Sequence, residues 1–390
     1  MIEDAFPYSL ANKDTIPADQ SLYDYLVKKA SEIEMDPNDR QLLLDMSQMW
    51  GCYIGDAIDR QSLRFAFLED CCGGGMNLGF MTSQMLIRYT EESVVASTFA
   101  DILKKLAAPA LASANILLKT LVVGIENLPS SPPTVSIKTE DGKEYQFDAA
   151  VVTTPLGWLK RNLHVFDPPI PGSLTKAIST ISVGHLEKVY LTFPRAFWRT
   201  PSTSTSTSTS TPDPYPGYTN WTSPSYAPST NPHAWPQEAY DLSAFAPPHA
   251  HPTLLFYTFG AASAHISGAI HGQPPATQHA FLAAFFAPYV ARLPGFADGD
   301  PACVPVASLA TAWRFDDLAG GGSYCNFQVG LEDADVGLEA LRTGCPDRRV
   351  WFAGEHVAPV EEMGTVTGAY LSGEGAARRV VAALGGGEEV

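Results

Sequence analysis

The residue best suited to bind a ligand is Glu355, which follows a strand-like stretch that ends at Gly354. A helix that opens on small residues is predicted from Thr365 to Leu384. Small residues let a ligand approach the backbone closely, and the first N–H groups of a helix have no partner within it. A carboxylate that faces such a helix N-terminus can accept hydrogen bonds from the hydroxyl groups of a ligand, while the first N–H groups of the helix donate to another polar part of it.

Lys188 is the second residue of this kind. It lies in a segment whose alternating pattern predicts a strand, with Leu186, Lys188 and Tyr190 on one side. Glu187 would point the other way, into solvent. A lysine that shares a strand face with apolar residues is usually an edge residue whose stem covers apolar surface.

The elements that must position these residues follow from local patterns. Apolar residues at helical spacing predict helices over residues 21–49, 41–53 and 98–111. Strands are predicted over residues 116–126, 134–139, 144–147 and 149–154, with Asp141 and Gly142 forming a hairpin turn between the second and the third. The Ser/Thr repeat from Ser202 to Thr211 is of low complexity and is expected to form a surface loop.

Several segments carry a resemblance to one family. They are Trp351-Phe-Ala-Gly-Glu-His356, Met363-Gly-Thr-Val-Thr-Gly-Ala-Tyr-Leu-Ser-Gly373, and the stretches 115–126, 151–157, 185–194 and 313–327. In this order they resemble the flavin-dependent amine oxidases, a family of polyamine oxidases, monoamine oxidases and flavin-type histone lysine demethylases. The likeness extends from about residue 21 to the end of the chain.

The resemblance implies an α/β (α+β) fold of two domains, an incomplete FAD-binding domain and a substrate domain built of an antiparallel sheet and helices. Residues 1–92 would form a helical part of the substrate domain and 93–165 the middle of the FAD-binding domain. Residues 166–310 would form the rest of the substrate domain, with a low-complexity loop at 200–216, and 311–390 the C-terminal part of the FAD-binding domain.

The resemblance also implies roles for individual residues. Lys188 would be catalytic, because the aligned family lysine hydrogen-bonds a water next to flavin N5. Tyr324 and Thr365 would contact the amine substrate, and Trp313, with Trp351, would flank the flavin or the substrate. The residues expected to bind FAD are Val122 (through its backbone, at the adenine), Thr154, Pro155, Trp313, Gly354, Glu355, Thr365 and Val366.

One family segment is not found in the sequence. Relatives open with a strand, a Gly-rich turn and a helix that binds the FAD pyrophosphate. Residues 1–20 contain no glycine, and Gly73 to Gly75 have the character of a loop. The chain is therefore expected to lack the dinucleotide-binding segment. Residues 77–92 fit no family segment and are expected to be either an insertion or a retained intron.

Composition excludes several classes of protein. The 25 basic and 42 acidic residues give a net charge of -17, which argues against a nucleic-acid binder. Acidic charge favours capture of a cationic amine, although an acidic surface also serves solubility alone. No apolar run is long enough to span a membrane. No metal site is predicted, because the six cysteines lack ligand spacing and His249 and His251 lie in a Pro-rich turn without carboxylates.

The functional expectation is an FAD-dependent amine oxidoreductase similar to polyamine oxidases. It would oxidise a C–N bond by hydride transfer to flavin, and the products would be an imine that hydrolyses and hydrogen peroxide from O2. A polyamine is the first expected substrate and methyl-lysine in a peptide the second. The alternative is a truncated, non-catalytic homologue that does not bind FAD and acts as a partner-binding module. The sequence predicts no oligomeric state.

Overall fold

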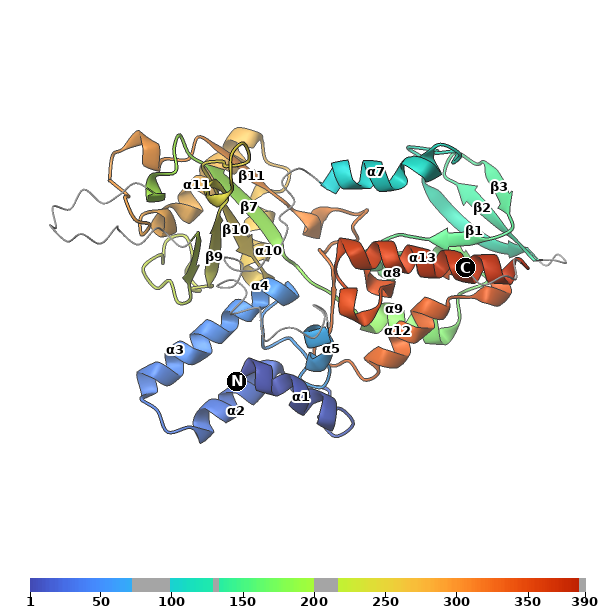
Figure 1. The fold of residues 1–390 in the computed structure, drawn as a ribbon, viewed down its shortest axis with the longest axis horizontal. Coiled ribbons are helices and arrows are strands. Elements are labelled where there is room, and N and C mark those ends of the chain that lie inside the picture. Colours follow the sequence, from blue (N-terminus) through green and yellow to red (C-terminus); the bar gives the residue numbers. More distant parts are fainter. Residues whose placement is uncertain (72–98, 129–132, 200–216, 386–390) are drawn as a thin grey trace. The chain divides into compact units, whose positions relative to one another are not determined.

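The computed structural model describes residues 1–71, 99–128, 133–199 and 217–385 (Figure 1). The chain forms two compact units, and each unit is built from two stretches of sequence. Unit 1 comprises residues 1–66 and 183–330, and unit 2 comprises residues 67–182 and 331–390. The predicted low-complexity loop, the Gly73–Gly75 loop and the predicted insertion at 77–92 lie outside the described residues.

The N-terminal part of unit 1 is helical. It consists of α1 (Ile2–Asn12), α2 (Leu22–Glu32), α3 (Pro37–Ser47), a short 3-10 turn (Gln48–Trp50) and α4 (Gly51–Ile54). Ser21 begins α2 with a reciprocal capping box to Asp24. The single helix predicted over residues 21–49 is divided, because Asp36 caps α3 and Pro37 occupies its first turn. Helix α1 has no counterpart among the elements predicted from the sequence.

The rest of unit 1 is an antiparallel five-stranded sheet with covering helices. The strand order is β11 (Ala307–Ala310), β7 (Glu187–Thr192), β10 (Thr253–Thr258), β9 (Gln237–Asp241) and β8 (Tyr218–Trp221). Helices α10 (Gly260–Ile270) and α11 (Pro275–Val290) follow β10, and the short strand β12 (Cys325–Asn326) comes after β11. Buried and partly buried side chains alternate along β7, so the sheet has one face in the core and one polar face.

The core of unit 1 lies between this sheet and α11. Val189 and Leu191 of β7 and Phe256 of β10 are fully buried and belong to one apolar cluster with Phe286 of α11. The ring centroids of Phe256 and Phe286 are 4.2 Å apart. Burial of these residues fixes which face of the sheet remains for polar side chains.

Unit 2 contains a mainly antiparallel sheet of four strands and a separate parallel pair of strands. A sheet has the order β3 (Glu144–Phe147), β2 (Thr134–Thr139), β1 (Val122–Leu128) and β5 (Phe166–Asp167), with β5 parallel to β1. The hairpin predicted at Asp141 and Gly142 is confirmed, and Gly142 has the positive φ of 81° that the turn requires. Strand β1 begins six residues later than the predicted start at residue 116.

The parallel pair is formed by β4 (Ala150–Val152) and β13 (Val350–Phe352). The helices of unit 2 are α5 (Ala66–Cys71, which starts at the boundary), α7 (Phe99–Leu111), α8 (Leu156–Arg161), α9 (Gly172–Thr180), α12 (Ala334–Thr343) and α13 (Val366–Ala383). Strand β6 (Ser182–Val183) lies at the boundary between the units. The long α13 agrees closely with the helix predicted from Thr365 to Leu384.

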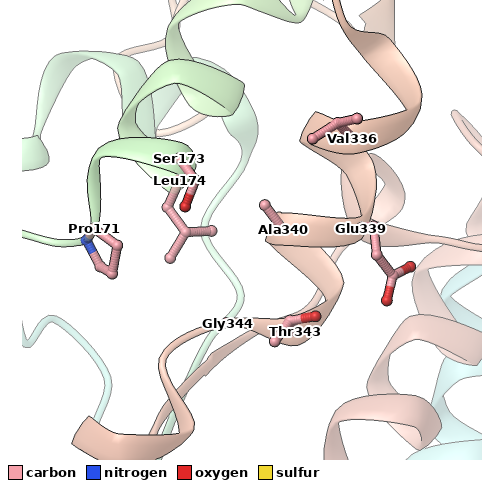
Figure 2. Close-up of a pocket in the computed structure, with 8 residues that line it drawn as sticks. All are labelled: Pro171, Ser173, Leu174, Val336, Glu339, Ala340, Thr343 and Gly344. Atoms are coloured by element: carbon pink, nitrogen blue, oxygen red, sulfur yellow. The ribbon is translucent and has the colours of Figure 1, made fainter.

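A shallow groove of about 370 Å³ lies between α9 and α12 (Figure 2). Its lining includes Leu174, Val336 and Thr343, and Glu339 is its one ionisable residue. Gly337 lies against Ala177, and a Cβ atom at Gly337 would approach the Ala177 side chain to 3.3 Å. The groove therefore marks close helix packing, and its residues offer no reactive group.

No helix in the described ranges combines the length and the apolar character that crossing a membrane requires.

Replacing Phe286 by alanine should lower the free energy of unfolding by about 3–5 kcal/mol, because it leaves a cavity against Phe256. Chemical denaturation followed by circular dichroism would measure this loss. Phe245→Ala, at a position 39% exposed in the same unit, is the control and should cost well under about 1 kcal/mol. Equal losses for both variants would contradict the assignment of the core.

Candidate functional site

The first group of site residues lies at one edge of the parallel pair in unit 2. Phe352 pairs with Val152, and the Ala353 N–H donates to the Val152 carbonyl at 3.0 Å. Thr154 and Pro155 therefore leave β4 at the same edge at which Gly354 and Glu355 leave β13. The carboxyl ends of neighbouring parallel strands are a common place for ligands. The structure thus brings together four of the residues that the sequence assigns to cofactor binding.

Helix α13 follows this edge soon afterwards in the sequence, and a hydrogen bond links the helix to it. The Thr365 hydroxyl caps the helix by accepting from the Gly368 N–H at 2.9 Å. The Gly354 N–H donates to the Ser372 hydroxyl of the helix at 2.8 Å. A Cβ atom at Gly368 would meet the Glu362 carbonyl oxygen at 1.9 Å, so only glycine allows this close approach. Thr365 and Val366 are exposed at the helix start, where a ligand can reach them.

His356 supports the turn that carries Glu355. Its ring is 1% exposed and packs against Gly354, where a Cβ atom would lie 2.9 Å from the ring. Neither ring nitrogen has a hydrogen-bond partner among the described residues. Burial lowers the pKa of His356 to about 4, so the ring is neutral near pH 7. Arg342 of α12 braces the same turn by donating to the carbonyls of Val357 and Ala358.

The second group of site residues lies in unit 1, around Lys188. Lys188 is on the partly exposed face of β7, as predicted, and its ammonium group lies 5.4 Å from the centre of the Tyr257 ring. Its backbone is fixed on both sides by Thr311, whose hydroxyl accepts from the Lys188 N–H and whose N–H donates to the Lys188 carbonyl. The lysine is therefore held in place at an aromatic surface.

The prediction that Glu187 points into solvent is wrong. Glu187 is 1% exposed, because it shares the core face of β7 with Val189. Its carboxylate accepts from the Thr311 hydroxyl at 2.6 Å and from the Arg314 N–H at 3.1 Å. These bonds anchor the turn that carries Trp313 beside the strand that carries Lys188. A period-2 pattern shows which residues share one side of the strand. It does not show that a carboxylate on that side meets buried hydrogen-bond donors.

The aromatic residues of the predicted site differ in their surroundings. The Trp313 side chain is 43% exposed, so it is available to a ligand. The Tyr324 hydroxyl donates to the Tyr53 carbonyl of α4, which ties it to the helical part of unit 1. Trp351 is 1% exposed and packs with Ala353 and Ala376, so the expectation that it flanks a ligand is wrong. Trp351 is the middle residue of a buried strand, and its side chain packs in the core.

One further observation completes the placement of the predicted residues. Val122 begins β1 and belongs to the larger sheet of unit 2, apart from the β4–β13 pair. The predicted residues thus form one group in unit 2 (Thr154, Pro155, Gly354, Glu355, Thr365 and Val366) and one in unit 1 (Lys188, Trp313 and Tyr324).

The sequence reading did not single out Glu238, a buried carboxylate on the same sheet as Lys188. It is 1% exposed and accepts from the Tyr218 hydroxyl at 2.8 Å. Tyr257 of β10 pairs with Lys188 on one side and with Glu238 on the other. The alternation of Glu238 and Tyr240 in the stretch 237–241 was the available signal, since it places both on one face of a strand.

Unit 1 thus contains an antiparallel sheet that carries Lys188. Unit 2 contains the edge at which strands β4 and β13 end, and this edge, called the ligand edge below, is joined to helix α13. The sequence profile of the family described as "flavin containing amine oxidoreductase" matches residues 54–381. The chain therefore belongs to this family, as the sequence predicted. The fold class is confirmed as well, since mixed helices and antiparallel sheet are shared with solved amine oxidases.

The structural relatives are similar in fold. A putrescine oxidase with the substitution A394C gives a TM-score of 0.64 at 16% identity, covering 98% of this chain and 74% of that chain. Cyclohexylamine oxidase from Brevibacterium oxydans gives a TM-score of 0.62 at 16% identity, covering 97% of this chain and 74% of that chain.

The sequence relatives match in part. Lysine-specific histone demethylase 1 homolog 3 of Arabidopsis thaliana is 28% identical over 269 residues, which is 69% of this chain and 14% of the relative. Polyamine oxidase 4 of Oryza sativa is 41% identical over 64 residues, which is 16% of this chain and 13% of the relative. The matched stretches therefore span only about one seventh of these relatives' own length.

Family membership implies FAD as the cofactor, and the ligand edge of unit 2 has features that fit it. The Thr154 hydroxyl is buried at this edge without a hydrogen-bond partner in the described part of the chain. Glu355 is partly exposed beside it, and small residues bring α13 close to the turn. An unsatisfied hydroxyl, a carboxylate and a helix N-terminus are suited to a polyol and a polar ring. Within the same ranges no cluster of His, Cys, Asp or Glu is arranged to hold a metal ion.

Glu187→Gln should destabilise unit 1 by about 1–3 kcal/mol, because an amide cannot accept from both the Thr311 hydroxyl and the Arg314 N–H. Trp313 fluorescence should change in the folded state, since its turn loses an anchor. Denaturation curves and emission spectra would measure both effects. Glu34→Gln, at an exposed position in the same unit, should alter neither, and an unchanged Glu187→Gln would refute the anchoring role.

His356 should make the protein sensitive to mild acid. The folded pKa lies below the unfolded value of about 6.5, so the stability is complete above pH 6.5 and is lost as the pH falls toward 4. Between pH 7 and pH 5 this residue should account for a loss of about 2 kcal/mol. His356→Leu should therefore lose less stability than the wild type over this interval, as measured by urea denaturation at both pH values. The exposed His164→Gln should follow the wild type, and parallel curves for all three proteins would disprove the assignment.

Proposed function

We propose that this protein is an FAD-dependent oxidoreductase that acts on amines of the polyamine type. The proposal rests mainly on the family match over residues 54–381, which includes both Lys188 and the ligand edge around Glu355. Polyamine oxidases are among the sequence relatives and a putrescine oxidase among the structural ones. The net charge of -17 supports a cationic substrate, because it attracts cations over a long range.

The reaction removes two electrons and two protons from a C–N bond. The carbon next to the amine loses a hydride and the nitrogen a proton, and water hydrolyses the resulting imine to an aldehyde and a smaller amine. O2 takes up the two electrons and two protons to give hydrogen peroxide. FAD, when bound, supplies the two-electron acceptor between amine and O2.

In this proposal the residues of unit 1 orient the substrate. Lys188 holds a water by hydrogen bonding, and its charge disfavours a protonated amine next to it. Only a neutral amine can release a hydride readily from the neighbouring carbon, so this repulsion selects the reactive form. Trp313 and Tyr324 offer aromatic faces against which the carbon chain can pack.

The residues of unit 2 bind the cofactor. The Glu355 carboxylate accepts hydrogen bonds from ribityl hydroxyls, and Thr154 offers at the same edge a hydroxyl that has no hydrogen-bond partner among the described residues. The start of α13 at Thr365 and Val366 directs N–H groups and the positive end of the helix dipole toward a ligand. A positive potential at that point stabilises negative charge on a bound ring system.

A second function is favoured by one observation. Helix α7 has no buried residue, and its apolar side chains Phe99, Leu103 and Leu106 are about half exposed. An apolar helix face that no described residue covers is typical of a surface that another polypeptide covers. The alternative is therefore a non-catalytic homologue in which unit 2 binds a partner and not FAD.

The visible absorption spectrum of the purified chain, with and without added FAD, distinguishes these functions. A flavin band near ~450 nm that co-elutes with the protein is expected, followed by peroxide release from spermidine. Glu355→Ala should weaken FAD retention by about tenfold or more, because it removes the acceptor for the ribityl hydroxyls. Glu374→Ala, an acidic residue later in α13, is the control. A colourless protein whose spectrum shows no bound flavin after FAD is added would refute the proposed oxidase function and favour the non-catalytic alternative.

Lys188→Met should retain FAD but lower the rate of turnover with amine by about tenfold to a thousandfold, because the positioned water loses its donor. Stopped-flow spectroscopy would separate the amine-dependent bleaching of the flavin from its reoxidation by O2. Turnover equal to that of the wild type in a protein that holds FAD would remove Lys188 from the proposed mechanism.

A further inference from the structure

Helix α11 and the chain that leads into β11 form an apolar surface in unit 1. Val304 and Val306 directly precede β11, and their side chains are 58% and 62% exposed. The His279 ring of α11 and the Ser308 hydroxyl of β11 lie 3.0 Å apart, so the helix and the strand are neighbours (Figure 1). Val306 is two residues before Ser308 and therefore points to the same side, toward α11. We call the surface made by α11, β11 and these two valines the α11–β11 face.

This face contains a groove of about 290 Å³ between α11 and residues 296–305. The lining is mostly small and apolar, and it includes Ala287, Ala291 and Val304. Ligand pockets usually measure about 300–1,000 Å³, so this groove is small for a cofactor and suits aliphatic side chains.

The exposed side of α11 is flat beside the groove. Ala280, Ala284 and Ala287 follow one another at helical spacing and are exposed. The distance between two packed helices depends on the side chains at their contact, so alanines allow another backbone to come close. Val306 projects next to this flat side. One surface thus carries both a groove and a side chain of a size that enters it.

Strand β11 lies at the edge of the five-stranded sheet, next to β7 on one side only in the described part of the chain. Edge strands in natural proteins are usually protected against pairing by charged residues, proline or a bulge. The sequence of β11, Ala-Ser-Leu-Ala, contains neither a charged residue nor proline. The open backbone of β11 is therefore able to pair with another strand.

The distribution of charge favours a second copy of this chain as the occupant. At a net charge of -17, two copies repel each other over much of their surface. Residues 242–291 and 301–313 contain no Asp, Glu, Lys or Arg, and these ranges include α11, β11 and both valines. Asp298 and Asp300 also line the groove, and Asp300 is paired with Arg195 at 3.0 Å. The α11–β11 face is thus a place where two copies can meet with little repulsion.

Symmetry adds a second argument for this occupant. A two-fold axis brings the same surface of two copies together, so the surface must be complementary to itself. The α11–β11 face meets this condition, because it offers a groove, a projecting valine and an open strand edge together. A basic partner would instead be attracted to the acidic residues elsewhere on the chain.

We propose that the α11–β11 face is the contact of a symmetric dimer of this chain. Val306 of each copy packs in the groove of the other, and the two β11 strands lie side by side in antiparallel orientation. The contact involves neither FAD nor an amine, so this proposal does not rest on the proposed function.

Sedimentation velocity of the full chain at concentrations between about 1 and 100 μM tests the dimer. The wild type should dimerise with a Kd on the order of 10 μM, because the contact is small and apolar. Val306→Lys should raise the Kd by about tenfold or more, since a lysine beside an open edge opposes pairing. Val336→Lys, at a valine that is 65% exposed on α12 of unit 2, is the matched control and should dimerise like the wild type.

The dependence on salt separates an apolar contact from one held by ion pairs. Raising NaCl from about 50 mM to about 500 mM should lower the Kd by about threefold or more, because salt screens the repulsion between the two acidic copies. A dimer that weakens as salt is added would indicate an ion-paired contact and would overturn the proposal.

Ala287→Arg is a second variant, which serves if circular dichroism shows that Val306→Lys does not fold. Its long side chain fills the groove, and it should also raise the Kd by about tenfold. A wild type that stays monomeric at about 100 μM would overturn the proposal. A dimer that both variants retain would overturn it as well, and loss of that dimer in Leu103→Lys would place the contact on α7.

Discussion

The alternation of side chains along β7 is the constraint on which the chemistry of unit 1 depends. Val189 and Leu191 are buried in the core, and this burial forces Lys188 onto the opposite face beside Tyr257. A shift of one residue would exchange the two faces, so the apolar core sets the position of the lysine. Glu187 extends the same constraint, because its buried carboxylate joins the core face to the turn that carries Trp313.

Unit 2 depends on a comparable but more local constraint. Two strands of three residues each are aligned in parallel, so the turns that follow them emerge at one edge. Glycines then control how closely the neighbouring helix approaches, and Gly368 allows a contact that any side chain would prevent. The residues suited to a cofactor are therefore gathered by backbone geometry.

The features of the fold and of the site that depend on a local sequence pattern could be predicted from the sequence. The hairpin at Asp141 and Gly142, helix α13 and the side of β7 on which Lys188 lies follow from turn residues and from periodicity. The burial of Glu187, the core role of Trp351 and the hydrogen-bond partners of Glu238 could not be predicted in this way. Each depends on donors or apolar partners from strands and turns that are distant in sequence, and periodicity does not specify which partner arrives.

The row from Lys188 through Tyr257 to Glu238 has a consequence for how this face of the sheet can change. The distance between the backbones at its two ends is set by the spacing of strands, which side-chain substitutions do not alter. Transferring an ionisable residue to a neighbouring strand would shift its charge in steps of about 4.8 Å. Finer adjustments on this face would have to come from the length and the rotamer of a side chain.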